Sequence, residues 1–502
     1  MKYDVIIAGA GPVGLFLACE LALARCAVLV LEKAADPVSP FKQFPFGIRG
    51  LSAPTLEALD RRDLLNALDT PQRRAHPFSK EAQAQAPRQA GHFAGIGFNA
   101  DRIDSTQWPY RLPTSTPTSL MSEMAALEAV LTDRAAQLGV DIKRGQAVTA
   151  ISQSEDAVTV FTDSAAFGGR WLVGCDGARS AVRKAGRFTF AGTEPSFTGY
   201  SIKADLADPS VLAPGRNLTS NGMYFQSQPG FLVMQQFDGG AAHDTGLCTL
   251  EHVQAVLRRV SNSNATIAAL HTASTWTDRA RQATEYRDGR ILLAGDAAHI
   301  HAPLGGQGLN LGLGDAMNLG WKLAATVHGT AAPGLLDSYQ RERHPIGMRV
   351  LDWSRAQAVL MTPTPEANAL RAIVSDLMQT VDGATYIAGR VWGIGTRLDL
   401  GDGHPLDGHS VPNFALDTGA TVGELLRDGR ALLLDFGGLR SGDALVRGYR
   451  GQIRYLAARA HDQLGLGALL IRPDGIVAWA CDAGVDTGTL AHVVARYWLP
   501  ER

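Results

Sequence analysis

A glycine-rich turn close to the N terminus is the feature that most constrains the fold of this chain. Residues 9–14 read GAGPVG and follow an apolar run at residues 5–7, which predicts a short buried strand. The residues after the turn continue at helical spacing, and AVLVLEK (27–33) predicts a second buried strand. A strand, a glycine turn, a helix and another strand within 33 residues predict a βαβ unit, and therefore an α/β fold.

The spacing within this turn predicts that the fold binds a dinucleotide. Gly9 permits the tight turn, Gly11 lets a pyrophosphate approach the backbone, and Gly14 lets the helix pack against the strand. Glu32 follows 18 residues after Gly14, where its carboxylate can accept ribose hydroxyls, but this pattern does not distinguish FAD from NAD. The predicted cofactor-binding residues of this unit are Gly9, Gly11, Pro12, Val13, Gly14, Glu32 and Lys33.

A second glycine-rich segment lies far away in the sequence. Residues 292–324 read LLAGDAAHIHAPLGGQGLNLGLGDAMNLGWKLA, which predicts a strand followed by a helix. Five glycines fall between residues 305 and 314, although each glycine inside a helix costs about 1 kcal/mol relative to alanine. The early glycines predict close approach of a planar ligand to the backbone. Gly312, Gly314 and Gly320 predict close helix packing instead.

These motifs carry a family resemblance. Together with WLVGCDGARSAVRK (171–184), they resemble the class A flavoprotein monooxygenases, which are FAD- and NAD(P)H-dependent aromatic hydroxylases. The resemblance covers about residues 1–390. It implies a Rossmann-type FAD-binding domain of the kind found in glutathione reductase and para-hydroxybenzoate hydroxylase, with FAD as cofactor.

The resemblance also implies roles for individual residues. Asp296 binds the ribityl chain of FAD, the loop after it lies along the isoalloxazine ring, and the first N–H groups of the next helix face the flavin N1/C2=O edge. Asp176 contacts the FAD pyrophosphate, although an ion pair with Arg179 or Arg183 explains this residue equally well. The implied flavin-binding residues are Asp176, Asp296, Pro303, Gly306, Gly308, Leu309 and Asn310.

Two positions depart from the family pattern. An arginine usually stands where this chain has Pro54, and Arg49, five residues earlier, is the candidate to replace its contact with FAD. The helix predicted at 122–139, with Ser122 as its N-cap, usually begins with Pro-Gln, whereas this chain has Glu123 and Met124 there. Whether the chain contacts the flavin at these two positions is therefore not decided by the sequence.

We expect three domains. Residues 1–180 and 286–390 form the discontinuous FAD-binding domain. Residues 181–285, with parts of 75–115, alternate apolar and polar side chains, which predicts an inserted mixed or antiparallel β-sheet that binds substrate. Through HSVPNFAL (409–416) and LIRPDGIVAWA (470–480), residues 395–502 resemble the thioredoxin-like domain of the polyketide-, phenol- and antibiotic-modifying subgroup. The single Cys481 excludes disulfide chemistry there. The predicted substrate-lining residues are Phe46, Tyr224, Gln226, Met234 and Gln236.

The resemblance implies that NAD(P)H, which we expect to be NADPH, reduces FAD. The same resemblance implies that O2 then forms a flavin C4a-hydroperoxide, which hydroxylates a bulky aromatic or polyketide-type substrate. A phenolic substrate needs no acid–base residue from the protein, so we predict no catalytic side chain. The alternatives are an antibiotic-inactivating enzyme that acts on rifamycin- or tetracycline-like compounds, a Baeyer–Villiger-type oxygenase, and a flavin-loaded protein that sequesters a ligand. The biological role is therefore antibiotic biosynthesis, resistance or catabolism.

Composition excludes several other classes of function. A net charge of −2 provides no basic field for nucleic acid or anionic lipid, and no run of apolar residues is long enough for a membrane span. Five scattered cysteines fit a reducing cytoplasm. We expect a monomer or a homodimer. Asp296, His299 and His301 could suggest a metal site, but the family resemblance explains Asp296 and the His-x-His pair has no other ligand nearby, so we predict no metal. A G-x-S-x-G hydrolase motif and a Trp-x-Trp-x-Ile-Pro halogenase segment are absent from the sequence.

Overall fold

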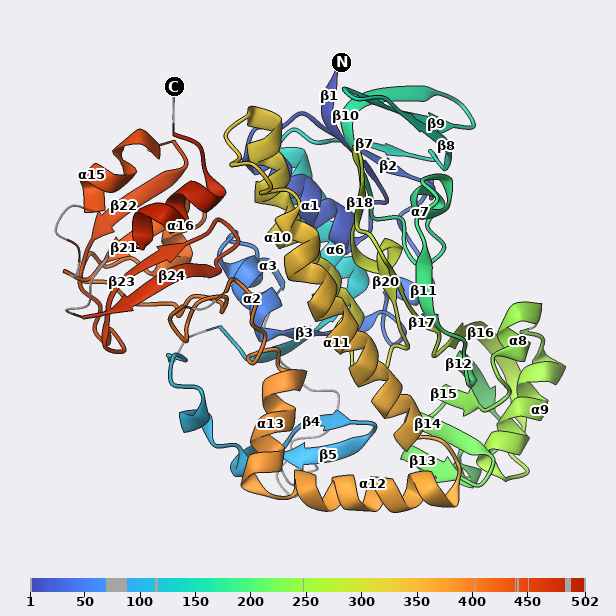
Figure 1. The fold of residues 1–502 in the computed structure, drawn as a ribbon. Coiled ribbons are helices and arrows are strands. Elements are labelled where there is room, and N and C mark those ends of the chain that lie inside the picture. The colour runs from blue at the N-terminus through green and yellow to red at the C-terminus, as the bar shows by residue number, and fades with distance from the viewer. Residues whose placement is uncertain are drawn as a thin grey trace.

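The computed structural model describes residues 2–68, 88–112, 116–246, 248–401, 403–437, 439, 442–449, 451–483 and 489–500 (Figure 1). Its central sheet has the order β18–β19–β10–β1–β2–β7, and all neighbours from β19 to β7 run parallel. The strands are β18 (Arg287–Asp288), β19 (Ile291–Leu293), β10 (Ala166–Gly174), β1 (Tyr3–Ala8), β2 (Val28–Glu32) and β7 (Asp141–Arg144), extended by antiparallel β8 (Val148–Gln153) and β9 (Val158–Thr162). The predicted βαβ unit and α/β class are confirmed.

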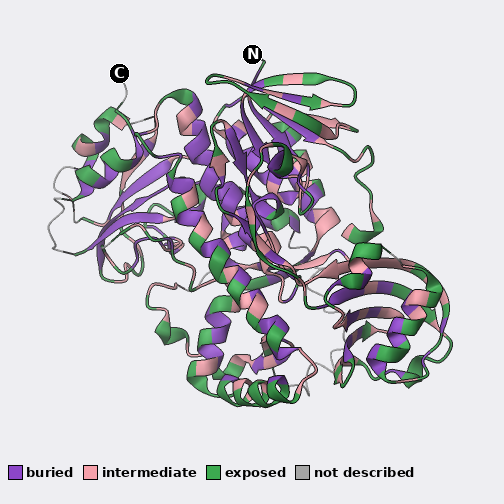
Figure 2. Ribbon diagram, turned by 45° about the vertical axis from the view of Figure 1, so that its right-hand side comes forward, coloured by how far each residue is buried: buried purple, intermediate pink, exposed green. Residues whose placement is uncertain are grey.

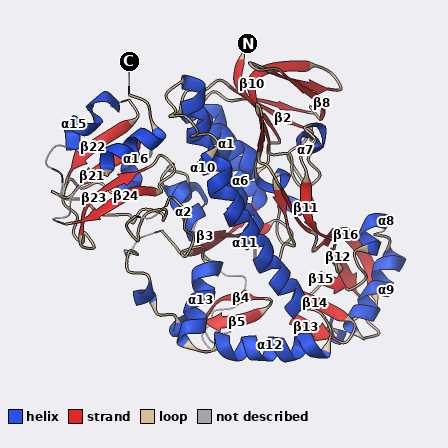
Figure 3. Cartoon of the chain, in the orientation of Figure 1, coloured by secondary structure: helices blue, strands red, loops and turns tan. Residues whose placement is uncertain are grey.

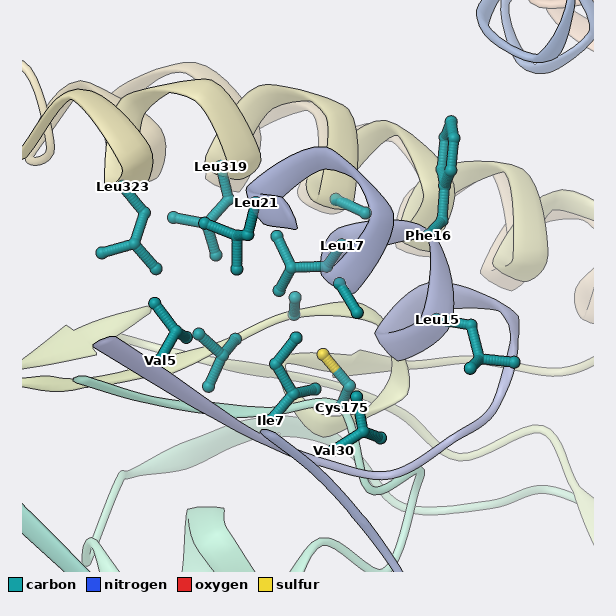
Figure 4. Close-up of a cluster of buried hydrophobic side chains, with 14 of the residues drawn as sticks. Val5, Ile7, Leu15, Phe16, Leu17, Leu21, Val30, Cys175, Leu319 and Leu323 are labelled. Carbon is teal, nitrogen blue, oxygen red and sulfur yellow. The ribbon is translucent and has the colours of Figure 1, made fainter. Parts of the chain in front are cut away.

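Helix α1 (Pro12–Leu23) packs between α6 (Met124–Gln137) and α10 (Gln307–His328). Figure 4 shows Leu17 and Leu21 of α1 between the strands and Leu319 and Leu323 of α10. A Cβ atom added at Gly320 would lie 2.6 Å from the Cβ of Glu20, so this glycine lets α10 approach α1. Added Cβ atoms at Gly312 and Gly314 would also lie under 3.0 Å from neighbouring side chains, so the predicted packing role of all three glycines is confirmed.

Two predicted helices have different bounds in the structure. The apolar spacing of SAPTLEALDRRDLLNAL (52–68) predicts one helix with Ser52 as a possible N-cap. In the structure this segment is divided into α2 (Ala53–Asp60) and α3 (Leu65–Leu68) by a turn in which Asp63 has a φ of 59°. Ser122 does not cap the next helix, because it belongs to β6 (Ser119–Glu123), which pairs with β3 (Ile48–Ser52). Helix α6 therefore begins only at Met124.

The predicted antiparallel sheet has the order β13–β14–β15–β12–β16. Helix α9 covers one face of it, and its buried side chains join those of the sheet in one core cluster (Figure 2). The elements of this region are β12 (Thr198–Leu206), β13 (Gly215–Thr219), β14 (Gly222–Gln228), β15 (Phe231–Gln236), α8 (Ala241–Thr245), α9 (Leu250–Ser261) and β16 (Ile267–Thr277).

Smaller elements connect this sheet to the parallel one. A three-stranded sheet joins the two regions, a hairpin packs near them, and α11 runs from α10 to α12 (Figure 3). These elements are β4 (Gln89–Phe93), β5 (Ile96–Asn99), α7 (Ala181–Ala185), β11 (Phe190–Thr193), β17 (Ala280–Ala283), β20 (His299–Ile300), α11 (Ser338–Leu360), α12 (Pro365–Met378) and α13 (Val381–Val391). Residues 75–87 and 113–115, which we assigned in part to substrate binding, lie outside the described residues. The domain boundaries stay predictions.

The C-terminal part has its own sheet, in the order β22–β21–β23–β24. Its elements are α14 (Val422–Leu425), β21 (Ala431–Asp435), α15 (Gly442–Val446), β22 (Ile453–Ala457), β23 (Leu466–Ile471), β24 (Val477–Asp482) and α16 (Leu490–Tyr497). Buried charges join this part to the rest of the chain. Arg472 lies 2.9 Å from Glu342 of α11, which also contacts Lys322 of α10 at 2.8 Å. In the part of the chain that the structure describes, no helix is long and apolar enough to cross a membrane.

Candidate active site

In the GAGPVG turn, the packing of the protein requires glycine at two positions but does not require it at the third. A Cβ atom at Gly9, which has a φ of 104°, would lie 2.4 Å from the carbonyl oxygen of Cys175. At Gly14 it would lie 2.0 Å from the carbonyl oxygen of Gly9. At Gly11 an added Cβ meets no heavy atom within 4 Å. Packing therefore explains Gly9 and Gly14, whereas Gly11 leaves free space beside the N terminus of α1.

Glu32 ends β2 beside this turn. Its carboxylate accepts hydrogen bonds from the backbone N–H groups of Ala10 and Ala34, both at 2.8 Å. A carboxylate offers about four acceptor positions, so this half-buried group can accept further hydroxyl donors. Lys33 is exposed next to it.

Asp296 and Arg49 come from distant segments and face the same region. Asp296 lies in a 3-10 turn (Gly295–Ala297) directly after β19, where it is exposed and has no hydrogen-bond partner among the described residues. Arg49 of β3 donates from Nη1 to the carbonyl oxygens of Phe46 and Ile48, at 2.7 and 2.8 Å. Burial lowers the pKa of Arg49, and the nearby carboxylate of Asp296 opposes that shift. The structure thus brings together two residues that the sequence singled out separately.

The N terminus of α10 is open toward the same region. Gly305 and Gly306 have φ values of 79° and 67°, and Gly306 is an N-cap without a capping side chain. The first N–H groups of a helix have no partner within the helix, so they are available to a ligand. A Cβ at Gly308 would make only an ordinary contact, at 3.4 Å from His301, and Pro303 is exposed beside it. Protein packing therefore does not explain the glycine at 308.

The side chain of Asn310 has a role that the sequence analysis missed. Its Nδ2 donates to the carbonyl oxygens of Gly50 and Gly306, at 2.8 and 2.9 Å, while its Oδ1 accepts from the N–H of Ser52 at 2.9 Å. Asn310 thereby clamps β3 to the glycine turn that begins α10. The neighbouring Leu309 is half-buried against the main core. An asparagine four residues after a helix N-cap was the only available signal, and it did not reveal its long-range partners.

Asp176 binds the first turn of α7, whose N-cap is Ser180. Its carboxylate accepts from the hydroxyl of Ser180 at 2.5 Å and from the N–H groups of Ala181 and Val182 at 2.6 and 3.1 Å. Arg183 donates instead to the carbonyl oxygens of Ala297 and Ala178. The ion-pair alternative therefore does not describe the geometry found here. Direct contact of Asp176 with a cofactor stays a prediction.

The two departures from the family pattern lie at opposite ends of β3. Pro54 is in the first turn of α2 and packs against Gly393, where an added Cβ would lie 3.0 Å from the proline ring. Met124 begins α6, and its N–H donates to the carbonyl oxygen of Gly47 at 2.9 Å. Glu123 is the N-cap of α6 without a capping hydrogen bond.

A buried charge network supports the turn that presents Asp296. Asp315 of α10 accepts from His299 at 2.6 Å, from Arg343 at 2.8 Å and from the N–H of Gly295 at 3.1 Å. Burial raises the pKa of Asp315, but His299 and Arg343 outweigh burial and lower it below its ordinary value. His299 is thus engaged by Asp315. Among the described residues, no group of three or more His, Cys, Asp or Glu side chains is arranged to hold a metal ion.

The prediction of which face of the antiparallel sheet binds substrate is wrong. Four of the predicted lining residues do share one face, but that face packs under α9. Tyr224 and Met234 belong to the core cluster of α9, Gln226 bonds the carbonyl oxygen of Leu212, and Gln236 bonds Arg259 of α9. The opposite face carries Met223, Phe225, Phe237 and Trp276, which join Ala302 and Leu304 on either side of Pro303.

Phe46 lies in an aromatic cluster at the edge of this region. Its ring centroid is 5.7 Å from Phe41 and 6.2 Å from Phe231, and Phe44 is also 6.2 Å from Phe231. Phe41 and Phe44 are 39% and 49% exposed, so their rings are accessible to a ligand. We call these four residues the aromatic entrance. It joins the segment before β3 to the first residue of β15.

The described residues fit an FAD molecule. Gly11 has free space beside a helix N terminus, the carboxylate of Asp296 has no described hydrogen-bond partner, and the N terminus of α10 has no cap. These three features come from segments about 285 residues apart, and each provides a group that a dinucleotide cofactor uses: phosphate space, an acceptor for hydroxyls, and N–H donors.

Comparison with known proteins agrees with this geometry. The FAD binding domain family matches residues 2–354, and the aromatic-ring hydroxylase C-terminal family matches residues 404–499. A monooxygenase from Claviceps purpurea (strain 20.1) is 44% identical over 499 residues and covers 98% of this chain and 97% of its own. Rifampicin monooxygenase from Streptomyces venezuelae is 36% identical over 490 residues, 95% of each chain. The OxyS anhydrotetracycline hydroxylase from Streptomyces rimosus has a TM-score of 0.85 at 36% identity, with complete coverage of both chains.

The chain therefore belongs to the family of FAD-binding aromatic-ring hydroxylases. It is a flavin-dependent monooxygenase, as its sequence motifs predicted.

Proposed function

We propose that this monooxygenase hydroxylates a bulky, planar aromatic or polyketide-type substrate, with NADPH as electron donor and O2 as oxidant. The aromatic entrance carries the proposal, because exposed phenylalanines beside a cofactor site favour a large flat molecule that stacks on them. Lys203, whose Nζ lies 5.6 Å from the ring centroid of Phe231, adds a cation at the same edge. The relatives named for rifampicin and anhydrotetracycline support a polycyclic substrate in either biosynthesis or inactivation.

In this proposal the chain holds FAD through residues of three segments. Glu32 accepts ribose hydroxyls, the turn at Gly11 receives the pyrophosphate, and Asp296 accepts ribityl hydroxyls with Arg49 nearby. The N–H groups at residues 307–309 face the ring edge, and Pro303, Gly306 and Gly308 lie along the ring. Lys33, Pro12 and Val13 line the same groove at its adenosine and phosphate ends.

FAD, when bound, supplies electron transfer from NADPH and transfer of one oxygen atom to the substrate. The chain provides the surroundings for this chemistry. The N terminus of α10 stabilises negative charge at the adjacent ligand edge, and Asn310 keeps β3 at the correct distance from that terminus. The apolar cluster around Phe225, Phe237 and Trp276 excludes water from the substrate side.

Further assignments belong to the same proposal. The C-terminal residues 395–502 form a thioredoxin-like domain, which is supported by one parallel and two antiparallel strand pairs in a four-stranded sheet. The FAD-binding domain comprises 1–180 and 286–390, and the inserted substrate domain 181–285. The cytoplasm is the proposed location, supported by five free cysteines.

Steady-state turnover tests the substrate class. We expect planar polycyclic phenols to accelerate NADPH oxidation and to gain one oxygen atom by mass spectrometry. Phe231→Ala lowers kcat/KM for the polycyclic substrate at least tenfold, because it removes the central ring of the aromatic entrance. Phe161→Ala, at a phenylalanine on β9 that is 39% exposed and lies outside the aromatic entrance, is the control with unchanged turnover. A flavin-loaded enzyme that no polycyclic phenol stimulates would instead indicate a sequestering protein.

Cofactor content tests the role of Asp296. Asp296→Ala folds but purifies without yellow colour, because this carboxylate has no described hydrogen bond within the protein. Asp288→Ala, at an exposed aspartate on β18 of the same sheet, retains FAD. Full FAD occupancy of Asp296→Ala contradicts the ribityl assignment.

A further inference from the structure

The structure contains a cavity of about 370 Å³ that the flavin site does not use. It lies where α2, α10, the segment 107–112 and the C-terminal residues 393–413 meet. In Figure 1, α2 lies between α10 and the C-terminal sheet, which is the same junction. Ligand pockets typically measure about 300–1,000 Å³, and this cavity is therefore large enough for a small molecule rather than single waters.

This cavity is separate from the flavin groove. None of residues 9–14 and 303–309, and neither Arg49 nor Asp296, is among its described lining residues, whereas Pro54 and Asn310 are. Asn310 is the shared wall, since it lines the cavity while its amide binds Gly50 and Gly306 on the flavin side. A ligand in the cavity would contact both the FAD-binding and the C-terminal parts of the chain.

The walls of the cavity are largely apolar and aromatic. Trp108 and Tyr110 form one side, and Leu313 and Met317 of α10 form another. Among the described residues, the hydroxyl of Tyr110 has no hydrogen-bond partner, although the ring contacts His404. Such walls favour a flat apolar molecule with a single polar group.

Positive charge on the lining exceeds the negative charge that can neutralise it. Arg61 and Arg111 lie 3.5 and 3.9 Å from the carboxylate of Glu57. The same carboxylate also accepts from the hydroxyl of Ser410 at 2.5 Å. The second carboxylate of the lining, Asp474, is already bonded by Arg472. Arg343, whose Nε bonds Asp315, adds a third guanidinium to the lining. The pair of arginines therefore has room for one further anion.

We propose that this cavity is a second binding site, for a planar apolar molecule that carries one anionic group, such as an aromatic carboxylate or phenolate. The aromatic and aliphatic walls hold the ring system, and Arg61 and Arg111 hold the anion. Because Asn310 separates the two sites, the occupant lies one side chain away from the flavin-binding end of α10. The site is independent of the substrate assigned above.

Fluorescence of 8-anilinonaphthalene-1-sulfonate, an aromatic anion, tests the proposal on the FAD-loaded full chain. We expect one saturable site. Ala58→Phe on α2 and Ile394→Trp on the C-terminal side fill the cavity from different walls, and each weakens probe binding at least tenfold. Arg111→Gln weakens binding at least threefold. Arg88→Gln, which removes the same charge from an exposed position of the hairpin region, leaves it unchanged.

Flavin absorbance and the melting temperature show which variants remain folded. Two variants that fill the cavity are used, so that the test still stands if one of them does not fold. If a filling variant retains FAD and binds the probe with unchanged affinity, the cavity is not the site. If Arg111→Gln and Arg88→Gln have equal effects, the anion does not bind at the arginine pair. Because probe binding needs no turnover, this experiment tests the cavity even if the proposed hydroxylase activity is not found.

Discussion

Gly11 offers a direct test of where the cofactor phosphates bind. Gly11→Ala adds a methyl group in open space, and the backbone there, at φ −76° and ψ 177°, is accessible to alanine. The free energy of unfolding of the apoprotein should therefore change by at most about 1 kcal/mol. The methyl group does, however, occupy the space proposed for the pyrophosphate.

The expected loss of FAD affinity follows from the contacts that the methyl group displaces. Two backbone N–H bonds to a charged phosphate contribute about 1.5–3 kcal/mol each, and their loss costs about 3–6 kcal/mol. FAD should then bind at least about a hundredfold more weakly. Titration of apoprotein with FAD, followed by flavin fluorescence, measures this change, and circular dichroism measures the stability.

Gly14→Ala is the matched comparison. Its Cβ would lie 2.0 Å from the carbonyl oxygen of Gly9, so the helix has to move and the free energy of unfolding falls by about 1–3 kcal/mol or more. If the Gly11→Ala apoprotein is as unstable as Gly14→Ala, Gly11 is required by packing. If Gly11→Ala binds FAD as tightly as the native chain, the phosphates do not lie at this turn.

Three further predictions address other parts of the molecule. Arg62→Met removes the partner that lies 2.6 Å from the buried Glu20 carboxylate, and the free energy of unfolding, measured with denaturant, should fall by about 3–5 kcal/mol. Adding Glu20→Gln should restore part of that loss. Burial raises the pKa of Asp407 from 3.8 to about 6, so the folded chain binds more protons than the unfolded chain between about pH 4 and 6. The free energy of unfolding therefore falls by at most about 3 kcal/mol as pH rises through that window, and Asp407→Asn should abolish this fall. An unchanged pH profile of stability in Asp407→Asn would contradict the assignment. A thiol reagent should label Cys248 first, because the other four cysteines are buried, and should find five thiols after denaturation without reductant; fewer than five would reveal a disulfide.

The local motifs were predictable because their meaning depends on neighbouring residues. A glycine turn between a strand and a helix has few alternative structures, and β1, α1 and β2 appear where the spacing of GAGPVG places them. Ser122 was misassigned because its partner in β3, Arg49, lies 73 residues away in the sequence, and this pairing holds Ser122 in a strand. A capping preference of about 1 kcal/mol does not outweigh a strand ladder that the sequence analysis did not see.

By itself, the sequence determined the βαβ unit, the flavin-binding class, and which residues of β14 and β15 lie on a common face, because side chains alternate along a strand. Only the tertiary structure decided which of the two faces lies under α9 and which lies beside Pro303, since alternation is symmetric and the packing partner comes from elsewhere in the chain. The same reason applies to Asn310, the aromatic entrance and the junction cavity: each is made by segments that are distant in sequence, and burial of apolar surface over the whole chain brings them together.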